Sequence, residues 1–241
     1  MPCGTCDQCE GGHVNRCRLG RSIGLGFGRD GGMCEEIVVP ARSLIALAPG
    51  IRVGDAALVE PLAVAVHGVR VAAVVPGQRV LVVGAGAVGL ACVVAARAAG
   101  AEVGLVARHP HQRAAGERLG ASSPSGEYDI VVDAAGTGEA VATAVEACRP
   151  GGTLLVLAPH GETVRVHGSD LLLKELRVVG SIYYGWGGVE RDTDVAARLL
   201  ADHPELPDVL ITHRFGLEDA AEAFRLAAAR DGGSIKVVVH P

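Results

Sequence analysis

Runs of consecutive apolar residues alternate with helix-type segments through the middle of the chain. RVLVVG (79–84) is apolar after its first residue, and AVGLACVVAARAAG (87–100) has helical spacing and ends at a glycine. Further apolar runs at 102–108, 129–136, 153–159 and 176–184 accompany helical segments at 111–120 and 138–152. Continuous Val and Leu runs of this kind are typical of parallel strands covered on both faces. The pattern predicts a doubly wound α/β domain, a parallel Rossmann sheet, over about residues 63–186.

The segments on either side follow other patterns. Residues 1–33 are rich in glycine and cysteine without periodicity, which predicts a loop held by something other than a core. We expect a short strand at 35–40, a buried helix within 58–72, amphipathic helices at 189–203 and 217–230, and a closing strand at 235–241. The predicted domains are therefore 1–62, 63–186 and 187–241.

Composition limits the classes of partner. The 241 residues are 49% apolar and carry a formal net charge of −5, which gives no electrostatic reason to expect nucleic acid. Val80 to Ala96 is uncharged, but it is shorter than the ~20 residues of a membrane span and contains a glycine turn. With no sign of a signal peptide, we expect a cytoplasmic protein without a membrane partner.

The glycine turn follows an apolar strand and opens a helix. Gly84, Gly86 and Gly89 form a GxGxxG motif whose intervening helix-start residues are Ala87 and Val88. In this context the glycines permit a tight turn, backbone approach to a pyrophosphate and close helix packing. The helix N-terminus supplies free N–H groups for the phosphates. We interpret these five residues as a dinucleotide site, the alternative being a glycine-rich turn without a ligand.

The end of the second strand indicates which dinucleotide is bound. An acidic residue is expected there for NAD, but Val103 to Gly116 contains no Asp or Glu. Arg108 takes the expected position, and Arg113 follows about one helical turn later. Because a guanidinium pairs bidentately with a 2′-phosphate, the sequence favours NADP(H) over NAD(H). The alternative for Arg108 is a solvated surface side chain.

Four of the seven cysteines lie within the first seventeen residues. Cys3, Cys6, Cys9 and Cys17 have the short spacings that tetrahedral zinc accepts, so we expect a structural zinc site. Cys34, Cys92 and Cys148 are isolated and are interpreted as small apolar residues.

The motifs together resemble the zinc-dependent medium-chain dehydrogenases, the family of alcohol, sorbitol, threonine and butanediol dehydrogenases. The cysteine cluster, VEPLAVAVHGV, GAGAVG, DAAG, RPGGTLLVLAP and LLLKELRVVGS occur in the order found in that family. The resemblance implies that the four cysteines bind structural zinc, that Glu60 is a catalytic-zinc ligand and that Ala158 contacts the cofactor. It also implies a GroES-like catalytic domain, an alcohol or ketone substrate and a homodimer or homotetramer.

Two departures from the family bear on activity. The family's catalytic Cys and its Gly-His-Glu motif precede the structural cysteines, so Glu60 is the only catalytic-zinc ligand that this sequence supplies. We therefore expect a truncated chain with an incomplete catalytic-zinc site, without activity by itself. Only ASSPSGEY separates Gly120 from the strand at Asp129, which predicts a sheet trimmed on one side. Tyr183, Tyr184 and Trp186 are expected at the substrate cleft, a dimer seam or a packed edge.

Three functions follow from these patterns. The first is a zinc-dependent alcohol or polyol dehydrogenase that uses NADP(H), with a vicinal diol as one substrate type. The second is a non-catalytic dinucleotide-binding remnant. The third is a zinc-independent enzyme of the quinone-reductase type, against which the cysteine cluster and Glu60 both count.

Overall fold

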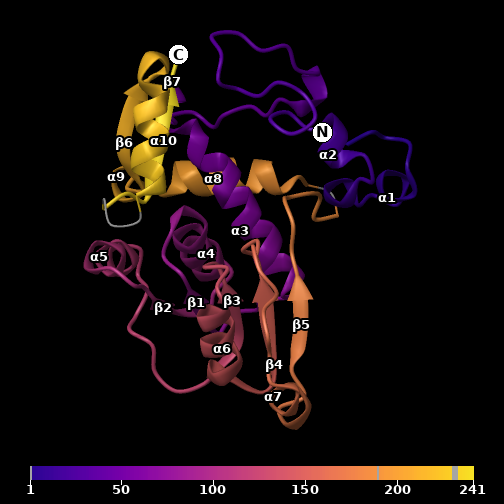
Figure 1. Ribbon diagram of the computed structural model, residues 1–241, viewed down its shortest axis with the longest axis vertical. Helices are drawn as coiled ribbons and strands as arrows, with labels where there is room; N and C mark the ends of the chain where they lie inside the picture. Colours follow the sequence, from indigo (N-terminus) through magenta and orange to yellow (C-terminus); the bar gives the residue numbers. More distant parts are fainter. Residues whose placement is uncertain (1, 189, 230–232) are drawn as a thin grey trace. The chain divides into compact units, whose positions relative to one another are not determined.

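The computed structural model describes residues 2–188, 190–229 and 233–241, and Figure 1 follows their path. The chain forms two compact units. One is Val64–Ser181, and the other combines the residues up to Ala63 with those from Ile182 onward.

The unit Val64–Ser181 contains a five-stranded parallel sheet. Its elements in chain order are β1 (Arg79–Val83), α4 (Ala87–Ala98), β2 (Glu102–Val106), α5 (Pro110–Arg118), β3 (Tyr128–Asp133), α6 (Gly138–Ala147), β4 (Cys148–Val156), α7 (Gly168–Leu173) and β5 (Arg177–Gly180). The strand order is β2-β1-β3-β4-β5, with every neighbouring pair parallel. The order reverses at β1, so the prediction of a doubly wound sheet is confirmed.

Helices cover both faces of this sheet. On one face, Val141 and Ala144 of α6 join a buried cluster with Leu81, Val131 and Leu154. On the other face α4 packs on β1 and β2, with α5 beside it. Leu155, which points away from α6, contacts Gly68 of α3 (Val59–Val71), where a Cβ would lie 3.3 Å from a Leu155 methyl group. Strands β1, β3 and β4 are apolar on both faces because helices cover both faces there.

The sheet ends early on its β2 side, as predicted from the short ASSPSGEY segment. In the described part of the chain, Ser122 makes only an isolated parallel bridge to Gly104, and no further strand pairs with β2. The buried ring of Tyr128 lies against Gly104, and Arg79 stacks on it with its Cζ 4.5 Å from the ring centroid. The Tyr128 hydroxyl accepts a hydrogen bond from the Ser125 N–H at 2.9 Å. Tyr128 therefore covers the sheet near its trimmed edge.

The other unit is less regular. Its longer elements are α8 (Asp192–Asp202), α9 (Leu206–Leu210), β6 (Ile211–Gly216), α10 (Ala220–Ala228) and β7 (Lys236–His240), and its N-terminal part holds α1 (Asp7–Glu10), α2 (Gly20–Ile23) and the first turn of α3. Among the described residues of this unit, 3-10 helices lie at Val14–Arg16, Ala41–Ser43, Val53–Leu58 and Leu217–Asp219. Strands β6 and β7 pair in parallel, and α10 packs on both.

Some predicted boundaries are wrong. The strand expected at 35–40 does not form, and Val38 there is 97% exposed. Residues 148–152, expected to end a helix, begin β4 instead, and β5 stops at Gly180 rather than at 184. Residues 189 and 230, at the ends of two predicted helices, lie outside the described residues.

The uncharged run from Val80 to Ala96 is divided between β1 and α4. Among the described residues, no helix combines the length and the apolar character needed to cross a bilayer.

Candidate functional site: a thiolate cluster and a dinucleotide edge

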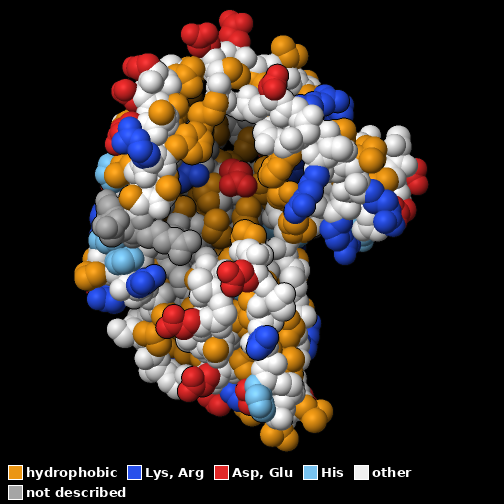
Figure 2. Space-filling view, in the orientation of Figure 1, with side chains coloured by type: hydrophobic (Ala, Val, Ile, Leu, Met, Phe, Trp, Pro, Cys, Tyr) orange, Lys and Arg blue, Asp and Glu red, His pale blue; other side chains and the backbone are white. Residues whose placement is uncertain are grey.

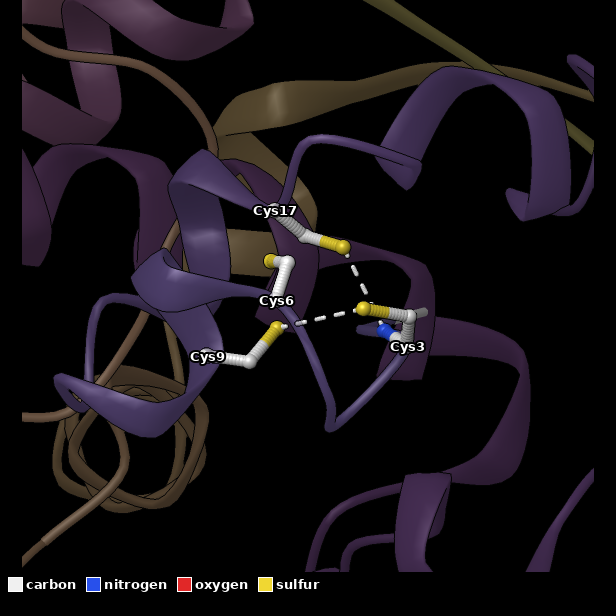
Figure 3. Close-up of side chains that lie close together, drawn as sticks. All are labelled: Cys3, Cys6, Cys9 and Cys17. Atoms are coloured by element: carbon white, nitrogen blue, oxygen red, sulfur yellow. Dashed lines mark hydrogen bonds between the residues drawn. The ribbon is translucent and has the colours of Figure 1, made fainter.

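The four N-terminal cysteines converge on one point (Figure 3). Their Sγ atoms all lie within 4.8 Å of one another, and Cys3 and Cys9 are 3.9 Å apart. Tetrahedral zinc with Zn–S bonds of about 2.3 Å places its sulfur atoms roughly 3.8 Å apart. The cluster therefore has the ligand type, number and spacing of a structural zinc site.

The backbone around the cluster prepares some of these thiols to bind a cation. The Thr5 N–H donates to Cys3 Sγ at 3.4 Å and lowers the pKa of that thiol to about 6. Backbone groups of Arg18 and Cys9 lower the pKa of Cys6. The Gly4 backbone lowers the pKa of Cys9, but lost hydration and the neighbouring thiols outweigh it and raise that pKa to about 11. A metal ion at the centre of the cluster would replace the thiol protons, because cysteine binds metal as the thiolate. The raised pKa of Cys9 would then no longer keep that thiol protonated.

The loop that carries the cysteines is also tied down by polar contacts. Arg18 donates two hydrogen bonds to the Asp7 carboxylate, at 2.5 and 2.6 Å, and so closes the loop between α1 and Cys17. Asn15 Nδ2 donates to the Ile182 carbonyl at 3.2 Å. The segment after Ile182 is held in turn by the fully buried Asp192, whose carboxylate accepts the Gly185 N–H at 2.6 Å.

The glycine motif lies where β1 ends. Gly84 has a φ of +107°, and a Cβ there would lie 2.9 Å from the backbone nitrogen of Ala135. A Cβ on Gly89 would overlap the Gly84 carbonyl oxygen, so this position also requires glycine. Gly86 is the N-cap of α4, and nothing in the structure lies within 4 Å of the place where its Cβ would be. Ala87 and Val88 form the first turn of α4, so their N–H groups have no acceptor within the helix.

The loop after β2 carries the basic residues predicted to select the cofactor. Arg108 is exposed directly beyond the strand, while Arg113 donates to the Ala107 carbonyl at 3.0 Å. The rings of His109 and His111 stack beside them, with centroids 5.5 Å apart. No acidic side chain occurs in this loop, so Arg108 is available to an anionic group, whereas Arg113 also braces the loop.

Behind the glycine motif, the ends of β3 and β4 are joined through one buried carboxylate. Asp133 Oδ1 accepts the Ala135 and Gly136 N–H groups at 3.1 and 3.0 Å, and Oδ2 lies 2.7 Å from His160 Nε2. The Asp133 backbone carbonyl accepts the N–H of Ala158, the predicted cofactor contact, at 3.1 Å. Sequence reasoning missed this pair. Asp133, an acidic residue within the apolar run DIVVDAAG, was a sequence signal for a buried polar partner. The partner, His160, lies 27 positions later, so spacing did not reveal it.

Glu60 lies apart from the cysteine cluster, in the first turn of α3. The surrounding protein removes part of the hydration of its carboxyl group and raises its pKa, and the positive charge of Lys236 opposes this. Burial and the charge of Glu60 raise the pKa of Tyr184. Across the described chain, the four cysteines are the only group of three or more metal-binding side chains, so Glu60 is not brought together with further ligands.

On the face drawn in Figure 2, acidic and basic side chains both lie at the surface among polar and apolar ones.

Comparisons with known proteins match these features. A family model described as zinc-binding dehydrogenase matches residues 122–202. L-galactonate-5-dehydrogenase of Escherichia coli K12 is 31% identical over 99% of this chain and 73% of its own length. D-xylulose reductase A of Aspergillus oryzae is 32% identical over 99% of this chain and 71% of its own length.

Solved structures of dehydrogenases are also similar to this chain. A zinc-binding dehydrogenase from Sinorhizobium meliloti 1021, solved with NADP bound, superposes with a TM-score of 0.88 at 31% identity, over 100% of this chain and 74% of that one. Galactitol-1-phosphate dehydrogenase from Escherichia coli superposes with a TM-score of 0.87 at 27% identity, over 100% of this chain and 75% of that one.

Proposed function

Because the chain belongs to the zinc-binding dehydrogenase family, we propose that it supplies the NADP(H) site and the structural zinc of a dehydrogenase that acts on a polyol or a related secondary alcohol. The observation that carries the proposal is the carboxyl edge of the parallel sheet. There the position of a Cβ on Gly86 is open, and the loop beyond β2 that carries the exposed Arg108 contains no acidic residue.

Each part of this edge has a separate task. The first turn of α4 offers N–H groups and a partial positive charge to the pyrophosphate. Arg108 pairs with the 2′-phosphate, and Ala158 borders the cofactor after β4. The nicotinamide, when bound, supplies the hydride chemistry, and the protein orients it. The four thiolates bind a zinc ion that holds the N-terminal loop in place.

We do not assign a second, catalytic zinc site to these 241 residues alone. Glu60 is a single carboxylate, and one carboxylate does not hold zinc. Zinc binding at the cysteines and cofactor binding without turnover are therefore the properties expected of the isolated 241-residue chain. The same properties are expected for the second function considered in the sequence analysis, a dinucleotide-binding protein without catalysis.

The substrate class comes from the relatives. L-galactonate-5-dehydrogenase, D-xylulose reductase and galactitol-1-phosphate dehydrogenase are all named for sugar acids, sugars or sugar alcohols. We therefore place a polyol or its ketone, vicinal diols included, ahead of a simple alcohol as the small-molecule partner.

The unpaired state of all seven cysteines is compatible with a reducing cytoplasm.

The sheet edge at β5 supports an oligomer. In the described chain β5 pairs only with β4; Val178 of β5 is 53% exposed, and Leu172 and Leu173 of the preceding α7 are 76% and 79% exposed. An unpaired strand edge flanked by apolar side chains favours pairing with a second chain, so we propose a homodimer or a homotetramer.

The preference for NADP(H) is tested at Arg108. In Arg108→Asp, loss of the phosphate partner should weaken NADPH binding about tenfold or more, while NADH binding is unchanged or improved. Arg118→Asp, on the last turn of α5, is the matched control and should leave both affinities unchanged. Tighter binding of NADH than of NADPH by the unmodified chain would overturn this preference.

A further inference from the structure

Three buried polar atoms lack a hydrogen-bond partner among the described residues: His111 Nε2, His160 Nδ1 and Ser181 Oγ. They follow the carboxyl ends of three different strands of the same sheet, β2, β4 and β5, within five residues of each end. Buried polar groups without partners are rare, and each calls for a specific explanation. All three therefore lie at the edge of the sheet where the proposed function places the cofactor.

The state of His160 follows from its partner. The Asp133 carboxylate can only accept hydrogen bonds, and its other oxygen is already used by the Ala135 and Gly136 N–H groups. His160 Nε2, 2.7 Å away, is therefore the donor. In the neutral imidazole this leaves Nδ1 without a proton, as a bare acceptor. The missing partner of Nδ1 must carry an N–H or an O–H.

The place of His160 along the edge selects one half of the dinucleotide. The adenosine ribose is recognised beyond β2, and the pyrophosphate lies at the glycine motif after β1. In the order β2-β1-β3-β4-β5, His160 lies on the other side of β1 from β2. The half of the cofactor that reaches this side is the nicotinamide riboside.

We propose that His160 Nδ1 accepts a hydrogen bond from the nicotinamide riboside half of NADP(H), and that Asp133 holds His160 in the tautomer that can do so. This inference rests on the proposed function. The donor is either the carboxamide N–H or a ribose hydroxyl. His160 is then a cofactor-contacting residue, and Asp133 is a positioning residue.

The test compares two ligands that differ in this half. NADPH carries the nicotinamide riboside, whereas adenosine 2′,5′-bisphosphate ends before it. In His160→Leu, the dissociation constant for NADPH should rise about tenfold, while that for the bisphosphate stays within about twofold. Retained bisphosphate binding also shows that the variant is folded. His203→Leu, which removes an exposed histidine bonded to Glu205, is the matched control and should change neither constant.

Asp133→Asn tests the tautomer separately. An asparagine amide can donate to His160 Nε2, which moves the ring proton to Nδ1 and removes the acceptor. NADPH binding should weaken by a similar factor, again without an effect on the bisphosphate. A merely structural role for the pair would weaken both ligands together.

The two possible donors are separated with the 3-acetylpyridine analogue of NADP, which lacks the amide N–H. If the amide is the donor, the unmodified chain should bind the analogue more weakly than NADP, and His160→Leu should bind the two equally. If a ribose hydroxyl is the donor, the unmodified chain should bind both equally, and His160→Leu should weaken both.

Unchanged NADPH binding in His160→Leu would overturn the inference and leave the proposed function intact. Failure of the unmodified chain to bind either NADPH or the bisphosphate would overturn both.

Discussion

At the residue scale, Asp55 shows how a buried charge is held in the less regular unit. Its side chain is 5% exposed, and its two oxygens accept hydrogen bonds from Arg52 and Arg214, each at 2.5 Å. Burial alone would raise the pKa of this carboxyl group, but the two guanidinium groups outweigh burial and lower it. Asp55 therefore ties the 3-10 helix Val53–Leu58 to β6.

Replacing Asp55 with Asn should lower the free energy of unfolding by about 1–2 kcal/mol at pH 7. Because the folded pKa lies below the unfolded value of about 3.9, the contribution is fully present above that value and is lost as the pH falls through the folded pKa. Urea unfolding from pH 7 to pH 3 measures this. Glu222→Gln, which breaks an exposed pair with Arg225, is the control and should cost at most about 0.5 kcal/mol. An equal difference between the parent and Asp55→Asn at every pH would contradict the assignment.

Pairs of this kind mark the limit of sequence reasoning at the residue scale. Spacing revealed the cysteine cluster and the glycine motif because their members are neighbours in sequence. Asp55 and Arg214 are 159 positions apart, and Asp133 and His160 are 27 apart. An acid in an apolar run signals a buried partner, but only the fold shows which residue it is.

At the element scale, the trimmed sheet depends on a small residue in β2. A Cβ on Gly104 would lie 2.5 Å from the Tyr128 hydroxyl and 3.1 Å from its ring carbon Cζ. Tyr128 is 3% exposed and is held by Arg79 and Ser125, so it has little room to move. The glycine in β2 is what allows one tyrosine to lie against the sheet at this position.

Gly104→Ala should therefore lower the free energy of unfolding by about 1–3 kcal/mol through overpacking. In a Tyr128→Phe background, which removes the nearest atom, the same substitution should cost clearly less. Chemical denaturation of the four chains of this double-mutant cycle measures the coupling. Additive effects of the two substitutions would show that Gly104 and Tyr128 do not constrain each other.

In the parallel sheet, the type and order of the five strands and of α4, α5 and α6 could be predicted, but their ends could not, and α7, α9 and β6 were not predicted. All five strands of the sheet are apolar runs bounded by glycine or turn residues, which is the strongest local signal. The segment EEIVVP has the same appearance, but it forms no strand in the structure. β4 begins at Cys148 rather than after Gly152 because pairing with Tyr128 extends it, a long-range contact that local pattern does not contain.

At the scale of the whole molecule, the cysteine cluster replaces a core in the N-terminal part of the chain. Between Pro2 and Glu36 the only buried residue is Gly24, which has no side chain, so little apolar packing holds this loop. In the zinc site that we propose at the four cysteines, the bound ion would supply the missing free energy of folding.

The purified chain should therefore contain about one zinc per chain, and Cys6→Ser should lose it. Cys34→Ser is the matched control, since Cys34 lies outside the cluster and donates to the Gly31 carbonyl. Metal analysis by mass spectrometry gives the zinc content of each chain. Zinc retained by Cys6→Ser, or two zinc ions in the parent chain, would contradict the assignment of a single site at these four cysteines.

The central claim is that the carboxyl edge of the sheet binds NADP(H), and a fluorescence titration of the zinc-loaded chain with NADPH and NADH tests it most directly. We predict saturable binding at one site per chain, with NADPH bound more tightly than NADH. No saturable binding of either nucleotide would contradict the account.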